Sequence, residues 1–200
     1  MKISKELIEM EQSLRAALSS GDDLHSMLKE LFLDPDFKEQ SALLVLVAKL
    51  EGELLSPTPV SLSVWANETI SRVGFVSKDS VIFRSTKVEG KSLIVDGLKV
   101  YLAEDLVVED YSCVDKTQNY EFVKLKEFKG KEINSSFPFL LLASEMCGVM
   151  KAAISMTVDY AKTRVQFGVP IGSFQAVAHP LADSYVKVEG LSALDRKSVV

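Results

Sequence analysis

The chain has 200 residues, of which 47% are apolar and 26% charged, and its formal net charge is −5. This composition is that of an ordinary soluble globular protein. The net acidity and the lack of a basic block exclude phosphate-driven nucleic-acid binding. Two cysteines and two histidines without metal-ligand spacing argue against a disulfide framework and against a zinc site, so we expect no metal.

Neither the apolar runs nor the N-terminus indicates a membrane or secretory segment. The runs at 42–48 and 137–143 are too short to cross a bilayer, so we expect no membrane span. The N-terminus is a polar helix start without the apolar stretch of a signal peptide. We therefore expect a reduced, cytoplasmic protein.

Helical apolar spacing fills the first part of the chain. It predicts helices over 5–18, 22–32 and 42–55, the last closed by prolines. From Val73 to Glu127 the apolar periods shorten into runs rich in Val, Ile, Phe and Tyr, bounded by turn residues. These runs predict an antiparallel sheet or a small barrel, with a tight turn at Asp96-Gly97.

Helical spacing returns after the serines at 135 and 136. A helix is predicted from Phe139 to about Val165, with a capping serine before it and Pro138 in an early position. We expect its core face to be formed by residues at three- and four-residue steps: Leu142, Met146, Val149, Met150, Ala153 and Met156. A second helix is predicted over 174–191, bent at Pro180.

The break between these two helices contains several residues that could bind a ligand. Arg164 offers a planar fork of donors suited to phosphate oxygens, Gln166 adds amide donors, and Phe167 adds a flat apolar surface. The next helix begins at Phe174-Gln175, with N–H groups favourable to anions. This set could hold a nucleotide diphosphate. The alternative is a helix hairpin in which Arg164 caps carbonyls and the phenylalanines are core.

The stretch YAKTRVQFGVPIGSFQAVAHPLAD, residues 160–183, resembles the first helix pair of the C-terminal domain of acyl-CoA dehydrogenases. The resemblance covers about 141–190. A weaker one extends to 42–59, similar to the family's Val-Ala-Glu-Glu-Leu-Gly segment, and to 97–101, similar to its Gly-x-Lys-x-aromatic strand. It implies an α+β fold with N-terminal helices (1–71), a small antiparallel β-domain (72–134) and the first two helices of a C-terminal helical bundle (135–194).

The same resemblance implies FAD as cofactor and an acyl-CoA thioester as substrate, in lipid metabolism. It places Arg164 and Gln166 on the FAD pyrophosphate of a partner subunit, and the Phe-Gln pair near the adenosine half. The implied cofactor-binding residues are Arg164, Gln166, Phe167, Phe174 and Gln175. It also implies a homo- or hetero-oligomer formed through the C-terminal helices. His179 matches the family motif, and we interpret it as a packing residue.

Several positions depart from the family pattern. A minority of members carry the catalytic glutamate at the position of Pro138, followed by an arginine at that of Phe139, and neither residue present here can act as a base. The strand threonine that bonds the flavin ring is Ala103 here. Glu145 is interpreted as an interhelix partner or part of a polar face. We therefore assign no catalytic residue to this chain.

The C-terminal end is also unusual. The family bundle has four helices and about two are present, which leaves apolar faces uncovered. Residues 195–200 match one translated frame of a common sequencing-adapter oligonucleotide, so we expect them to be foreign. Three hypotheses follow. The chain is a dehydrogenase subunit that is inactive alone, a non-catalytic partner that lends FAD contacts to a catalytic subunit, or an unrelated helical interaction domain.

Overall fold

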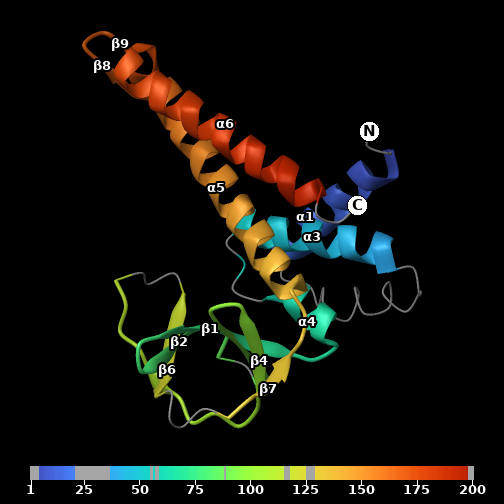
Figure 1. Cartoon of the computed structure of the whole chain (residues 1–200). Helices are drawn as coiled ribbons and strands as arrows, with labels where there is room; N and C mark the ends of the chain where they lie inside the picture. The colour runs from blue at the N-terminus through green and yellow to red at the C-terminus, as the bar shows by residue number, and fades with distance from the viewer. Residues whose placement is uncertain are drawn as a thin grey trace.

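A computed structural model describes residues 5–20, 37–54, 56, 59–87, 89–114, 118–124 and 129–197. Within these residues, three N-terminal helices precede a sheet, and two long helices follow it: α1 (Lys5–Ser20), α3 (Phe37–Glu53), α4 (Val60–Ala66), α5 (Phe137–Thr163) and α6 (Gln175–Lys197). The sheet lies at one end of the molecule, and the α5–α6 pair projects away from it (Figure 1). The predicted α+β class and element order are confirmed. The helix predicted over 22–32 lies outside the described residues.

The sheet is mixed, which corrects the expectation of an antiparallel domain. Its order is β5-β6-β2-β1-β3-β4-β7. The strands are β1 (Ile70–Ser77), β2 (Ser80–Ser85), β3 (Lys91–Asp96), β4 (Lys99–Ala103), β5 (Glu109–Asp110), β6 (Asn119–Lys124) and β7 (Lys131–Ile133). β1 and β3 are parallel and the other pairs are antiparallel.

The parallel pair has a topological cause. After the β1–β2 hairpin the chain crosses the start of β1, where the Thr86 amide donates to the Ser71 carbonyl at 2.9 Å and the Lys91 amide to the Thr69 carbonyl at 2.8 Å. β3 is thereby laid on the free edge of β1 and runs in the same direction. The β3–β4 hairpin then turns at Gly97, whose φ of +57° is the left-handed value that glycine adopts without cost.

The sheet separates two apolar cores. One face packs on the helices through Val73, Leu93, Val95 and Val100, which join Leu50 and the other buried apolar residues of α3 and α4. The opposite face holds a smaller cluster formed by Val81, Phe83, Ile94, Ala103 and Val123. Because successive strand side chains point to opposite faces, neighbours such as Leu93 and Ile94 belong to different cores.

Ion pairs join elements that are distant in sequence. Glu53 at the end of α3 accepts from Arg15 of α1 at 2.6 Å and from Lys151 of α5 at 3.1 Å. Arg84 of β2 pairs with Glu145 of α5. The partner of Glu145 is therefore a strand residue and not a residue of another helix, as the sequence had led us to expect. Glu145 links the sheet to the helical layer.

The predicted core face of α5 is wrong. Of its six members, Met146, Val149, Ala153 and Met156 are exposed and the other two are half-buried. The buried residues of α5 are Pro138, Leu141, Ser144, Cys147, Gly148 and Ala161. The helix is apolar on more than one side, so its sequence spacing did not identify the side that meets α3. That side is the one carrying small residues.

The length and apolar composition of α5 are also those of a membrane-spanning helix. Within the described residues, it alone is long and apolar enough to cross a membrane. The core helix of a soluble protein can meet the same criterion. In this structure α5 contacts α3 and α6, and Glu145 within it is paired. The absence of a membrane span stays a prediction.

Candidate cofactor-binding site

The break between α5 and α6 is a small hairpin at the end of the α5–α6 pair farthest from the sheet (Figure 1). Strand β8 (Val165–Gln166) pairs with β9 (Val169–Pro170), and a 3₁₀ turn, η2 (Ile171–Ser173), leads into α6. Phe167 and Gly168 form the two-residue loop with φ of +52° and +82°. Positive φ at both loop positions is the geometry of the tightest hairpin turn, so the tip is narrow and its side chains project outward.

The five predicted contact residues all lie on this tip or at the start of α6, and all are exposed. The Phe167 ring is 93% exposed and meets Phe174 edge to face, with ring centroids 6.2 Å apart. Neither phenylalanine is core, so that part of the alternative interpretation is wrong. The backbone amide of Arg164 donates to the Tyr160 carbonyl at 2.8 Å. Its guanidinium has no hydrogen bond or ion pair within the described part of the chain.

This arrangement presents exposed donors beside an aromatic pair. A guanidinium and a carboxamide on an exposed tip can bind the oxygens of a diphosphate, and the adjoining rings can cover a flat group. A hollow of about 380 Å³ lies beside the hairpin root, with mainly apolar walls that include Ala161, Gly172 and Leu181. None of the five residues lines it. The hairpin tip therefore forms only one side of a candidate binding site, and a second surface is needed to enclose a ligand.

The hairpin cannot share a cofactor with the sheet of its own chain. Helix α5 has 27 residues, which correspond to a length of about 40 Å. The sheet lies near its first turn and the hairpin follows its last (Figure 1). A dinucleotide held by the tip therefore cannot reach the sheet of the same chain.

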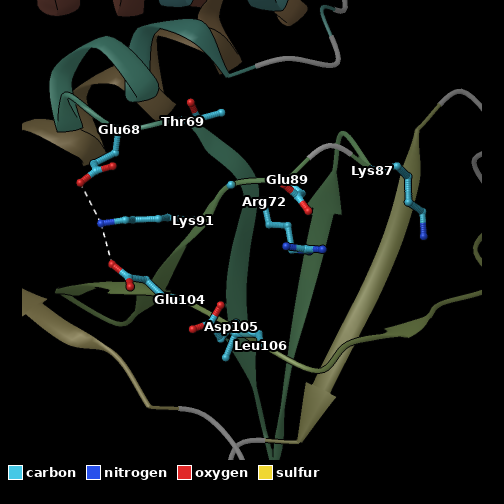
Figure 2. A pocket seen from close by; sticks show the side chains of 10 residues that line it. Glu68, Thr69, Arg72, Lys87, Glu89, Lys91, Glu104, Asp105 and Leu106 are labelled. Atoms are coloured by element: carbon cyan, nitrogen blue, oxygen red, sulfur yellow. Dashed lines mark hydrogen bonds and ion pairs between the residues drawn. The ribbon is translucent and has the colours of Figure 1, made fainter.

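The end of β4, where the family motif places the flavin ring, does not fit that ring. Ala103 carries a methyl group, is 1% exposed and packs in the sheet cluster with Phe83 and Ile94. The next residues, Glu104 and Asp105, line a pocket of about 700 Å³ that holds charged side chains of both signs (Figure 2).

Ion pairs already occupy much of this pocket. The Lys91 ammonium lies 2.7 Å from Glu68 and 2.6 Å from Glu104, and so connects the start of β1 to the end of β4 (Figure 2). Its hydrogen bonds to Glu104 and Glu68 raise the pKa of Lys91. Arg72 is paired with Glu121 at 2.6 Å. Both cations are therefore already ion-paired with carboxylates of the same chain.

A second pocket, of about 580 Å³, lies where α4, β4, β7 and the start of α5 meet. We call it the Trp65 pocket; it is lined by Trp65, Ala66, Leu102, Lys131, Glu132, Ile133, Asn134, Ser135 and Phe137. Pro138, at the position of the alternative family base, is buried in the first turn of α5. His179 is exposed on α6, so its interpretation as a packing residue is wrong within this chain.

Sequence reasoning missed Glu51. Its side chain is 2% exposed, although it lies in the last turn of α3 beside two other charged residues. The carboxylate accepts hydrogen bonds from the first residues of α4. Nothing in the local sequence pattern distinguishes Glu51 from Glu53, because the burial of Glu51 depends on the position of α4 in the folded chain.

Comparison with known proteins finds a family match in the C-terminal part of the chain. Residues 140–199 match the family described as acyl-CoA dehydrogenase, C-terminal domain. The acyl-CoA dehydrogenase IpdE2 of Mycolicibacterium smegmatis is 50% identical over 60 residues, which are 30% of this chain and 19% of that relative. Residues 140–199 are therefore similar to the C-terminal domain of acyl-CoA dehydrogenases, and the resemblance found in residues 160–183 is confirmed. The match spans less than a fifth of the relative's length.

The fold agrees over a longer range. The structure of glutaryl-coenzyme A dehydrogenase in its glutaryl-CoA complex matches with a TM-score of 0.58 and 13% identity, over 100% of this chain and 77% of that one. The ChsE4-ChsE5 complex from Mycobacterium tuberculosis matches with a TM-score of 0.50 and 18% identity, over 100% of this chain and 69% of that one. At these identities the likeness concerns the fold alone.

Proposed function

We propose that this chain is a subunit of an FAD-dependent acyl-CoA dehydrogenase, and that its hairpin contacts FAD bound mainly by an adjoining subunit. Arg164 and Gln166 would hold the pyrophosphate, and Phe167, Phe174 and Gln175 would lie along the adenosine half. The observation that carries this proposal is the position of an exposed guanidinium at the end of α5 opposite the sheet, without a partner among the described residues. The bound FAD would accept hydride during α,β-dehydrogenation of an acyl-CoA thioester.

A second candidate is a non-catalytic partner in a heteromer. It is favoured by the buried methyl group of Ala103, by Pro138 at the alternative base position and by the ion-paired pocket at the end of β4. A subunit of this kind would supply the hairpin and no chemistry. One of the structures with a similar fold is the ChsE4-ChsE5 complex, which is compatible with either candidate.

The FAD contact is tested in the reconstituted oligomer. Arg164→Ala leaves a cofactor phosphate without its partner and should weaken FAD binding by about 2–5 kcal/mol. Arg164→Lys keeps the positive charge but loses the planar fork of donors. Its FAD affinity should therefore lie between those of the wild type and Arg164→Ala. Lys187→Ala removes an exposed charge from α6 and serves as the control. Unchanged FAD affinity in the Arg164→Ala oligomer would remove the assignment.

Catalysis is tested separately with the purified chain. We expect no turnover of any acyl-CoA with an artificial electron acceptor, because Pro138 and Phe139 occupy the alternative base position of the family and neither can accept a proton. Adding the cognate partner should restore turnover if the chain is a partner subunit. Turnover by the chain alone would contradict the non-catalytic candidate.

A further inference from the structure

The side of α5 that faces away from α6 carries an apolar stripe. Its members recur at steps of three and four residues over about four turns, and all are exposed or half-buried: Met146, Val149, Met150, Ala153, Met156, Thr157 and Tyr160. Helix α6 packs against the other side of α5, where Ile154, Val158 and Ala161 line the hollows between the two helices. We call these seven residues the outer stripe. Their spacing is that of a helix that packs against a further helix.

The outer stripe is matched to a second copy of itself. Ala153 is its central and smallest member, and side chains of similar kind lie at equal distances on either side of it. Methionines lie three positions away at Met150 and Met156, and Val149 and Thr157, four positions away, have the same branched shape. None of the seven residues is charged, and the Thr157 hydroxyl already donates to the Ala153 carbonyl at 2.7 Å. Two copies related by a two-fold axis would therefore bring neither like charges nor an unpaired hydroxyl together at the centre of the stripe.

We propose that two copies of this chain pair through the outer stripe, with their α5 helices antiparallel and the two-fold axis at Ala153. A small residue at the axis lets the two helix backbones approach closely. The antiparallel direction follows from the position of the sheet, which is broader than α5 and lies beside its first turn (Figure 1). Parallel helices would bring two sheets to the same end, whereas antiparallel helices keep the sheets apart and set the two helix dipoles in opposite directions.

This pairing places the hairpin of each copy beside the other copy. Thr163, the last residue of α5, lies ten positions after Ala153, and Ala143 lies ten positions before it. The end of one α5 therefore lies opposite Ala143 of the other copy, and the hairpin beyond it extends past the first turns of that helix towards its sheet (Figure 1). The other copy thereby supplies the second surface that the hairpin tip lacks in its own chain. The pairing rests on the outer stripe and goes beyond the proposed FAD contact.

Disulfide cross-linking of the full chain tests the position of the axis. A disulfide needs Cα atoms within about 7 Å of each other, which two copies of one residue meet only close to a two-fold axis. Mild oxidation of Ala153→Cys should therefore give a dimer linked from position 153 to position 153. Peptide mass spectrometry separates this link from any made by Cys113 or Cys147. Leu98→Cys, on the β3–β4 turn and 93% exposed, is the control for random collision. Adding Met156→Glu places a charge in the outer stripe and should abolish the link at position 153.

A mixture of two variants tests the direction of the helices. Met146 and Tyr160 lie seven positions from Ala153 on opposite sides, so antiparallel helices should link Met146→Cys of one copy to Tyr160→Cys of the other. Parallel helices would instead link each variant to itself.

The cross-linking is done without FAD, and Arg164→Ala should leave the link at position 153 unchanged, so the pairing and the FAD contact can fail independently. The pairing is overturned if Ala153→Cys gives no more dimer than Leu98→Cys, or if the Met146→Cys chains link mainly to one another. It is also overturned if the chain inserts into phosphatidylcholine vesicles as a monomer, which the length and apolar composition of α5 would permit.

Discussion

Gly52 of α3 and Gly148 of α5 each lie directly against the backbone of the other helix. A Cβ atom on Gly52 would be 1.9 Å from the Glu145 carbonyl oxygen, and one on Gly148 would be 1.9 Å from the Lys49 carbonyl oxygen. Only residues without a side chain permit this approach. The crossing brings α5 onto α3 and decides which face of α5 is buried.

Gly148→Ala should lower the free energy of unfolding by about 1–3 kcal/mol, because the two helices must separate to admit the methyl group. Gly190→Ala in α6 is the matched control. Its Cβ would meet no atom within 4 Å, so it should raise the free energy of unfolding by about 0.5–1 kcal/mol through helix propensity. Urea denaturation measures both. Stabilisation by both substitutions would contradict the close approach.

The Arg84–Glu145 pair should contribute to holding the sheet on α5. Either Arg84→Met or Glu145→Gln leaves a charged or polar partner in a mostly dry position, and each should cost roughly 1–3 kcal/mol. This is below the range for a fully buried pair, because the side chains are 26% and 12% exposed.

A double-mutant cycle isolates the interaction of that pair. Arg84→Met combined with Glu145→Gln should cost less than the sum of the single changes. The exposed Lys99–Glu132 pair, at 3.2 Å, is the control and should show little or no coupling, because solvent screens it. Additive losses at Arg84 and Glu145 would show that the two side chains act independently.

Glu51 should make the chain less stable as the pH rises. Its pKa is about 8 in the folded state against 4.5 without the surrounding protein, so the folded chain holds a proton that the unfolded chain has lost. The contribution is therefore fully present below pH 4.5 and is lost by about pH 8. Glu51→Gln should flatten this part of the curve in chemical denaturation at several pH values. A curve of unchanged slope would assign the pH dependence to other groups.

The exposed apolar side chains of α5 and α6 should cause the isolated chain to associate. Met156 is 73% exposed and Val186 67%, and Met146 and Leu194 are both 63% exposed. Met156→Glu and Val186→Glu should reduce association without lowering the free energy of unfolding, since neither side chain is buried in one chain. Light scattering coupled to gel filtration measures the mass. Phe75→Glu, at an exposed apolar position on β1, is the control and should leave the mass unchanged.

The sequence by itself determined the local elements and the family that its C-terminal part resembles. The helix, sheet, helix order follows from apolar spacing and turn residues, since both act over a few neighbouring positions. The motif from Tyr160 to Asp183 sufficed to indicate the family. Its residues are consecutive along the chain, so the whole motif can be read without knowledge of the tertiary structure. Its two-residue loop, Phe167-Gly168, shows in the structure the positive φ angles of a tight hairpin.

The tertiary structure alone decided which distant residues meet. Arg84 and Glu145 are 61 positions apart, and their contact depends on how the sheet is laid against α5. The parallel β1–β3 pair depends on the path of a connection, and the buried face of α5 on two glycines in different helices. Glu51 became a buried group only because α4 folds back over it. Such contacts depend on the arrangement of whole elements, about which local spacing carries no information.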